Sequence, residues 1–138
     1  MKVVFADSGF WIAFVNPRDQ LHERSQTVYR SLGPHRLVTS EMVLVEVFNG
    51  LATRGAMVRD AVVTLERGLR NQANVTVVPQ TSASFREAVA HFAERLDQQW
   101  SLTDCSSFLI MRREGIIDAL AHDRDFEQAG FRALLRDP

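Results

Sequence analysis

Cysteine is nearly absent from the sequence: Cys105 is the only one among 138 residues. A single thiol excludes an internal disulfide framework and a zinc site built from cysteines. Long apolar runs are absent as well, since no stretch approaches the ~20 residues that span a membrane. The first apolar run is short and Asp7 interrupts it, so we expect no signal peptide. These absences predict a cytoplasmic protein that does not depend on disulfides.

Lysine is just as scarce, and the basic residues are almost all arginine. Lysine and arginine total 16, and Lys2 is the only lysine, which leaves fifteen arginines. The guanidinium group suits phosphate recognition, but a high-GC coding bias produces the same excess, and we give that explanation more weight. The net charge of −1 gives no sign of nucleic-acid binding through bulk charge.

The order of expected elements predicts an α/β fold. A chain of 138 residues can bury roughly two-thirds of its unfolded surface in one domain. Without repeats, low-complexity tracts or linkers, we expect a single domain over residues 1–138. Apolar periodicity and turn residues predict strands at residues 2–6, 36–39, 74–79, 116–121 and 131–135, alternating with helices at 21–32, 41–53, 57–69, 85–96, 104–114 and 124–129. This alternation predicts a central, mostly parallel sheet of four to five strands in an α/β/α sandwich.

The first strand ends on an acid. Residues 2–6 are too uniformly apolar for a strand with one wet face, which indicates a central strand covered on both sides. Asp7, Ser8 and Gly9 follow directly. Ligands of parallel sheets bind beyond the carboxyl ends of the strands, so Asp7 is a candidate site residue. The alternative is that Asp7, or Ser8 in its place, only caps the next helix.

A second candidate acid lies in an apolar helix. Ser40 can cap the helix expected at residues 41–53. Leu44, Phe48 and Leu51 lie opposite Glu46 on that helix, which predicts that the helix is mostly buried. A buried acid must be paired, protonated or bound to a metal. The alternative is that an arginine pairs with Glu46 or that its carboxylate reaches solvent.

Two further acids stand at element ends late in the chain. Thr103 can cap the helix at residues 104–114, which places Asp104 in its first turn. The strand at residues 116–121 is followed by His122, Asp123, Arg124 and Asp125. Two carboxylates ~4 Å apart repel by roughly 4 kcal/mol at an effective dielectric constant of 20, and a divalent cation removes that cost. Oxygen ligands alone point to Mg²⁺ or Mn²⁺, and such acidic pockets catalyse phosphodiester cleavage.

One more helix is expected to be amphipathic, between the two halves of this acidic pattern. Ser84 and Glu87 have the spacing of a capping box. The apolar stripe of this helix consists of Phe85, Ala88, Val89, Phe92 and Leu96. His91 borders the stripe, and a packing role explains it better than metal ligation.

These motifs, in this order, resemble a known family. The matching segments are Phe5-Ala6-Asp7-Ser8, Thr39-Ser40-Glu41-Met42-Val43-Leu44-Val45-Glu46, Leu102-Thr103-Asp104, Ala121-His122-Asp123-Arg124-Asp125-Phe126 and Gly130-Phe131. Over essentially the whole chain, the sequence resembles a PIN domain, specifically the VapC-type ribonuclease toxin of a type II toxin–antitoxin pair. Each motif alone is weak, and the combination is fairly specific.

The resemblance implies a divalent-metal-dependent endoribonuclease. It implies Asp7 and Asp104 as the principal Mg²⁺ (or Mn²⁺) ligands, Glu46 as the residue that positions metal or water, and Asp123 as the residue that completes the pocket. Ala121 departs from the family, which commonly has a hydroxyl residue there, and Asp125 remains a rival for the fourth role. The implied partners are an RNA substrate, a small cognate antitoxin and a second copy of the chain, with no membrane.

Other protein classes fit less well. Phosphoacceptor domains and haloacid-dehalogenase-like phosphatases also place an acid after the first strand, but they use a late lysine, and those phosphatases need a second acid where Gly9 stands. Dinucleotide and P-loop motifs are absent. Two alternatives stay open within the PIN family: an RNA-processing nuclease without an antitoxin, and a degenerate binding scaffold. Arg112, Arg113 and Arg124 are candidate RNA contacts only because they lie near the acidic motifs.

Overall fold

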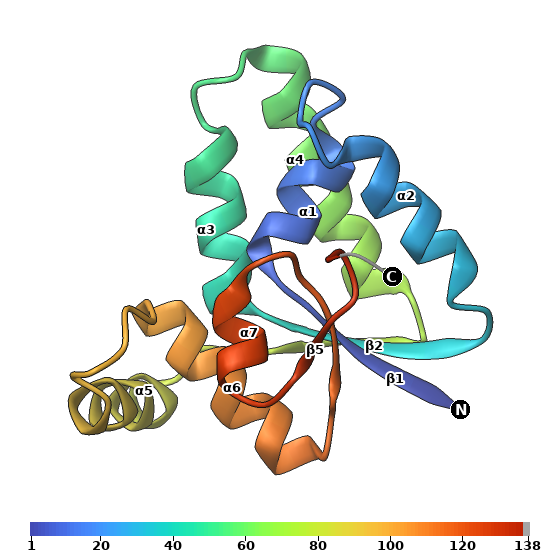
Figure 1. Ribbon diagram of the computed structural model, residues 1–138. Helices are drawn as coiled ribbons and strands as arrows, with labels where there is room; N and C mark the ends of the chain where they lie inside the picture. The colour runs from blue at the N-terminus through green and yellow to red at the C-terminus, as the bar shows by residue number, and fades with distance from the viewer. Residues whose placement is uncertain (137–138) are drawn as a thin grey trace.

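The computed structural model describes residues 1–136, which form a five-stranded sheet flanked by helices (Figure 1). The strands are β1 (Lys2–Ala6), β2 (His35–Ser40), β3 (Val75–Val78), β4 (Asp118–Leu120) and β5 (Arg132–Ala133). The helices are α1 (Ser8–Val15), α2 (His22–Ser31), α3 (Glu41–Leu51), α4 (Ala56–Asn71), α5 (Ser82–Glu94), α6 (Leu102–Glu114) and α7 (Arg124–Gln128). The predicted α/β class and strand positions are confirmed, with the strands differing by a few residues at their ends.

The strands are all parallel, in the order β3-β2-β1-β4-β5. The central position of β1 explains its apolar sequence, because Val4, Phe5 and Ala6 are fully buried. Phe5 lies opposite Val38 of β2 and Ala119 of β4. The carboxyl ends of these three strands therefore meet at one edge of the sheet, which is where the acids were predicted to gather.

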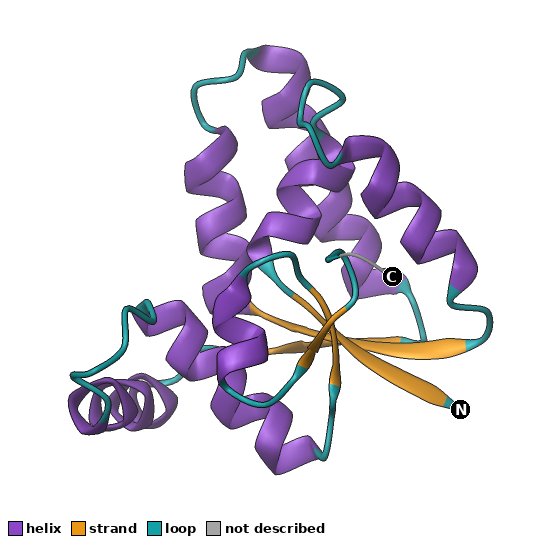
Figure 2. Ribbon diagram, viewed as in Figure 1, coloured by secondary structure: helices purple, strands orange, loops and turns teal. Residues whose placement is uncertain are grey.

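Helices cover both faces of the sheet. Figure 2 shows the strands as a twisted layer, with α1, α2 and α4 on one side and α5 and α6 on the other. Helices α3 and α4 form a hairpin that extends beyond the sheet, as Figure 1 shows. The core between these layers includes Phe10, Phe108, Met111 and Phe126, each with no exposed surface. No helix among residues 1–136 is long and apolar enough to cross a membrane.

Two helix starts differ from the prediction. Helix α6 begins two residues earlier than expected, because Ser101 rather than Thr103 is its cap: the Ser101 hydroxyl accepts a bond from the Asp104 N–H. Thr103 is buried inside the first turn. Helix α5 is capped by Thr81, which forms a capping box with Ser84, so the predicted box between Ser84 and Glu87 is wrong. In both cases the cap is a hydroxyl residue earlier in the chain than the predicted one, and it accepts a hydrogen bond from a free backbone N–H group of the first turn.

The prediction that α3 is mostly buried is wrong, because one face of the helix is exposed. Val43, Val47 and Leu51 are buried, but Val45 is 56% exposed and Phe48 is 37% exposed. The hairpin of α3 and α4 projects past the sheet, so no other element of the described chain covers that face.

The apolar stripe of α5 faces outward instead of toward the core. Phe85, Val89, Phe92 and Leu96 are between 44% and 80% exposed, whereas Ala88 and His91 are buried. Helix α5 packs on α6, and its buried residues are Ala88 and His91. The periodicity correctly predicted a helix but selected the wrong face as the buried one. The packing role of His91 is consistent with its burial.

Candidate active site

Asp7 lies at the carboxyl end of β1 and is only 6% exposed. Asp7 occupies the N-cap position of α1, but its side chain makes no capping hydrogen bond to that helix. The pKa of Asp7 is raised to about 8, mainly by burial and then by the nearby Asp104 carboxylate, with smaller increases from Glu46 and Asp123; the Ser8 backbone N–H opposes this rise. Asp7 is therefore the deepest acid in a group of acids.

Glu46 approaches Asp7 from α3. Its side chain is half-buried, and its Oε1 atom accepts a 2.7 Å hydrogen bond from the Ser8 hydroxyl. The Ser8 side chain does not cap α1. No arginine among residues 1–136 forms an ion pair with Glu46. The hydroxyl after Asp7 was overlooked as a functional residue, although its place beside a candidate acid was a usable signal.

Asp104 enters the site from the first turn of α6. One carboxylate oxygen accepts a 3.1 Å hydrogen bond from the Ser101 backbone N–H. Burial raises the pKa of Asp104 to about 7; the Ser101 N–H lowers it, and the Asp123 and Asp125 carboxylates raise it. The capping box holds the backbone and carboxylate of Asp104 in one orientation, which leaves its second oxygen free for the site.

Asp123 and Asp125 complete the group from the segment after β4. Asp123 caps α7 by accepting a 2.9 Å bond from the Asp125 N–H. Carboxylate oxygens of Asp104, Asp123 and Asp125 all lie within 4.8 Å of one another. The sequence treated Asp123 and Asp125 as rivals, but the tight turn brings both carboxylates next to Asp104.

Nothing within the described chain neutralises this cluster. Five carboxylates from four separate elements converge, and none of them forms an ion pair with a lysine or arginine among residues 1–136. The donor atoms are all oxygen, the ligand type that Mg²⁺ and Mn²⁺ prefer. The residues present therefore fit a divalent cation, which would relieve both the mutual repulsion and the burial of charge at Asp7 and Asp104.

Comparisons with known proteins agree with this geometry. The PIN domain family matches residues 4–132 of the chain. The 23S rRNA-specific endonuclease VapC20 of Mycobacterium tuberculosis is 32% identical over 133 residues, which cover 94% of this chain and 95% of that protein.

Two solved structures share the fold. The crystal structure of Mycobacterium tuberculosis VapC20, a sarcin–ricin loop cleaving toxin, superposes with a TM-score of 0.81 at 30% identity, covering 93% of this chain and 95% of that one. VapBC2 from Rickettsia felis, bound to a DNA fragment from its promoter, gives a TM-score of 0.59 over 95% and 96% of the two chains. At 9% identity the second likeness supports the fold alone.

The family match spans nearly the whole sheet, and the motifs predicted from the sequence stand at the sheet edge where the acids meet. The chain therefore belongs to the PIN-domain family, as a member of VapC type.

Proposed function

We propose that this chain is the RNA-cleaving toxin of a toxin–antitoxin pair and that its five converging carboxylates form the active site. VapC-type PIN domains are divalent-metal-dependent endoribonucleases, and the chain is an endoribonuclease of this type. The observation that carries the site assignment is the burial of Asp7 and Asp104 among like charges with no cationic side chain beside them.

Each acid has a distinct place in this proposal. Asp7 and Asp104 are the principal ligands, because both side chains are buried and both residues are anchored at the ends of regular elements, Asp7 after β1 and Asp104 in the first turn of α6. Asp123 and Asp125 close the outer side of the site next to Asp104. Glu46, oriented by Ser8, accepts a proton or orients water on the inner side. A divalent cation held there would polarise the phosphate and make water more acidic.

The test of this function is cleavage of RNA by the purified chain. We expect cleavage with Mg²⁺ or Mn²⁺ and loss of cleavage in excess chelator, restored when either cation is added back. Full cleavage in chelator would refute a metal-dependent mechanism, and no cleavage under any condition would favour a degenerate binding scaffold. A comparison of rates with Mg²⁺ and Mn²⁺ shows which cation the site prefers.

We also propose that a small antitoxin blocks this site in the cytoplasm, where the RNA substrate is found. An exposed acidic edge favours a partner segment that carries an arginine, since a guanidinium can bridge two carboxylates. Expression of the chain alone should arrest growth, and co-expression of a small neighbouring gene should relieve the arrest. A chain that is harmless at high level yet cleaves RNA in vitro would favour the RNA-processing alternative.

Helix α5 supplies the surface for the proposed homodimer. Its exposed apolar residues follow one another at intervals of four, three and four positions: Phe85, Val89, Phe92 and Leu96. This is the spacing of a coiled-coil seam, which requires a second helix to cover it. An antiparallel copy of α5 would set Val89 beside Phe92 of the partner and Phe85 beside Leu96, so the seam complements itself.

A further inference from the structure

The acidic segment between β4 and β5 has little support of its own. Asp123 is exposed and Asp125 is half-buried, and the helix that they begin, α7, has only five residues. Helices much shorter than ~12 residues are marginal by themselves in water. The position of these two carboxylates beside Asp104 therefore depends on contacts with other parts of the chain.

The chain that follows β5 supplies the first of these contacts. The Leu134 N–H donates a 2.9 Å hydrogen bond to the Ala119 carbonyl, and the Leu135 N–H donates a 3.0 Å hydrogen bond to the Ala121 carbonyl. Leu135 is 2% exposed and Ala121 is fully buried. The pairing of β4 and β5 (Figure 1) thus continues until two residues before Asp123.

The side chain of Arg136 extends this contact to the acidic segment itself. Its Nη1 atom donates a 3.0 Å hydrogen bond to the carbonyl oxygen of His122, the residue directly before Asp123. Its Nε atom forms a 3.0 Å ion pair with Oε1 of Glu127 in α7. A guanidinium is planar and carries its donors in a fixed geometry. One side chain therefore holds the segment that carries Asp123 and Asp125 at two points.

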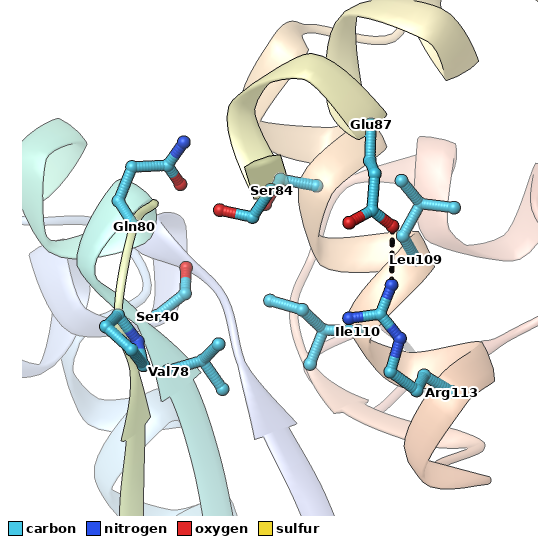
Figure 3. Close-up of a pocket in the computed structure, with 10 residues that line it drawn as sticks. Ser40, Val78, Gln80, Ser84, Glu87, Leu109, Ile110 and Arg113 are labelled. Atoms are coloured by element: carbon cyan, nitrogen blue, oxygen red, sulfur yellow. Dashed lines mark hydrogen bonds and ion pairs between the residues drawn. The ribbon is translucent and has the colours of Figure 1, made fainter. Parts of the chain in front are cut away.

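The bond to the backbone carbonyl is the more important of the two contacts. Ion pairs between exposed side chains contribute little, as expected for Arg113 and Glu87, which are 60% and 50% exposed and are joined by the dashed line in Figure 3. Glu127 is likewise 51% exposed, whereas the Arg136 side chain is 26% exposed. A carbonyl of the main chain cannot rotate away as a side chain can. The bond to His122 therefore fixes the backbone in front of the acids.

Arg24 of α2 holds Arg136 in turn. Its Nε atom donates a 3.2 Å hydrogen bond to the Leu135 carbonyl, and its Nη2 atom donates a 2.6 Å hydrogen bond to the Arg136 carbonyl. Both contacts are partly buried, and they join residues more than 110 positions apart in the chain. A continuous set of contacts thus runs from α2 through Arg136 to the residue before Asp123.

We propose that Arg136 is a positioning residue that holds the Asp123–Asp125 segment in its metal-binding geometry, and that Arg24 supports it. The inference rests on the proposed metal-dependent ribonuclease function, and Arg136 lies beyond the segment that matches the PIN-domain family, residues 4–132. Residues that orient metal ligands without touching the metal change affinity or activity by about 10- to 100-fold when they are replaced. The expected effect is therefore on the affinity for the cation.

Binding of Mn²⁺ to the folded protein without RNA tests this role. The electron paramagnetic resonance signal of free Mn²⁺ falls as the ion binds, which gives the dissociation constant Kd. We expect Arg136→Ala to raise Kd about tenfold, the equivalent of about 1.4 kcal/mol, and Arg24→Ala to raise it about threefold. Arg132→Ala is the matched control, because Arg132 pairs at 3.4 Å with Asp118, the first residue of β4. Its Kd should stay within about twofold of wild type.

Two further variants make the test sharper. If Arg24 acts through Arg136, the double variant Arg24→Ala/Arg136→Ala should bind Mn²⁺ no more weakly than Arg136→Ala. A roughly thirtyfold loss in the double variant would show that the two arginines act independently and would overturn the role of Arg24. Arg136→Lys keeps the charge but offers one nitrogen in place of two, and we expect its Kd to rise about threefold. Arg136→Lys replaces Arg136→Ala in the test if thermal melts in chelator show that the alanine variant does not fold.

Cleavage of RNA separates positioning from catalysis. At saturating Mn²⁺ we expect Arg136→Ala to reach a kcat within about twofold of wild type with an unchanged KM for RNA, because excess cation restores the site. The Mn²⁺ concentration that gives half of the maximal rate should rise in parallel with Kd.

The contrary outcomes identify which proposal fails. An unchanged Kd in folded Arg136→Ala, or a loss of kcat that saturating Mn²⁺ does not restore, would overturn the positioning role and leave the nuclease intact. A wild type that binds no Mn²⁺ at millimolar concentration would overturn both the metal site and the role of Arg136. A wild type that binds Mn²⁺ without cleaving RNA would count against the ribonuclease function, and Mn²⁺ binding would still decide the role of Arg136.

Discussion

Single hydroxyl and carboxyl groups decide how this site is arranged. Asp7 follows the end of β1, and Asp104 lies in the first turn of α6. Neighbouring backbone and hydroxyl groups orient two of the acids, Asp104 and Glu46. The Ser101 N–H holds Asp104, and Ser8 holds Glu46. The Ser101–Asp104 contact is local, whereas the Ser8–Glu46 contact joins residues that are 38 positions apart in the chain. The geometry of the site therefore depends on small polar residues as much as on the acids themselves.

Removal of one charge from either buried ligand should abolish most of the activity. We expect Asp7→Asn and Asp104→Asn each to lower the rate of RNA cleavage at least about a hundredfold, because each would lose a proposed direct ligand. The measurement is the cleavage rate at saturating Mg²⁺ or Mn²⁺. Asp60→Asn, on the exposed face of α4, is the matched control. Near-wild-type turnover in either site variant would show that the ligand assignment is wrong.

Ser8 should act through Glu46. Without the 2.7 Å hydrogen bond, the Glu46 carboxylate can rotate away, so we expect Ser8→Ala to lower kcat roughly fivefold, the equivalent of about 1 kcal/mol, with KM for RNA little changed. Ser8→Thr keeps a hydroxyl and should restore most of the rate. If Ser8→Ala and Ser8→Thr lost activity equally, the role of Ser8 would be structural instead.

At the scale of elements, helix α5 differs most from its prediction. Its apolar stripe was recognised from the sequence, but the side that packs on α6 is the side with Ala88 and His91. A helix can pack on its own domain through one face and bind a partner through a second, apolar face. The sequence pattern alone does not say which face belongs to the monomer core.

Charge placed on that outer face should separate the proposed dimer. We expect Phe92→Glu to convert the protein from dimer to monomer in size-exclusion chromatography with light scattering, because a carboxylate in an apolar seam is strongly unfavourable. Thr64→Glu on the exposed face of α4 is the control. A wild type that is monomeric at high micromolar concentration, or a Phe92→Glu protein that stays dimeric, would contradict the role of α5.

For the whole molecule, the acidic cluster links stability to pH and to metal. The pKa values of Asp7, about 8, and Asp104, about 7, lie above the ~3.9 of an unfolded aspartate. The folded protein therefore binds more protons than the unfolded chain between about pH 4 and pH 8. The free energy of unfolding of the metal-free protein should fall as the pH rises through that window. His91, whose pKa is lowered by burial and then by Arg112, contributes the opposite slope.

Thermal melts in chelator from pH 5 to pH 8.5 test this link. We expect wild type to lose stability toward high pH and Asp104→Asn to melt higher at pH 8, because one repelling charge is gone. Both proteins contain His91, so its contribution to the pH dependence of stability cancels in the difference between them. Metal at a hundred times its dissociation constant should stabilise wild type by about 2.7 kcal/mol and the variant by less. A wild type that gains nothing from metal and melts above the variant in chelator would show that these acids form no common site.

The sequence alone determined the α/β class, the central place of β1 and the candidate acids, because each follows from local information. A run buried on both faces is uniformly apolar, and strands that alternate with helices form parallel sheets whose carboxyl ends share one edge. Asp7, Asp104 and Asp123 could therefore be assigned to that edge, and the family assignment agrees with the fold.

Only the tertiary structure decided which side chains meet there. The choice of Ser101 over Thr103 as the cap, the bond from Ser8 to Glu46 and the inclusion of Asp125 beside Asp123 depend on distances of a few tenths of a nanometre between separate elements. The outward face of α5 and the contact of Arg136 with the His122 carbonyl likewise depend on how separate elements pack together. Periodicity records that a helix has an apolar face, but burial is a property of the assembled layers, which no local pattern contains.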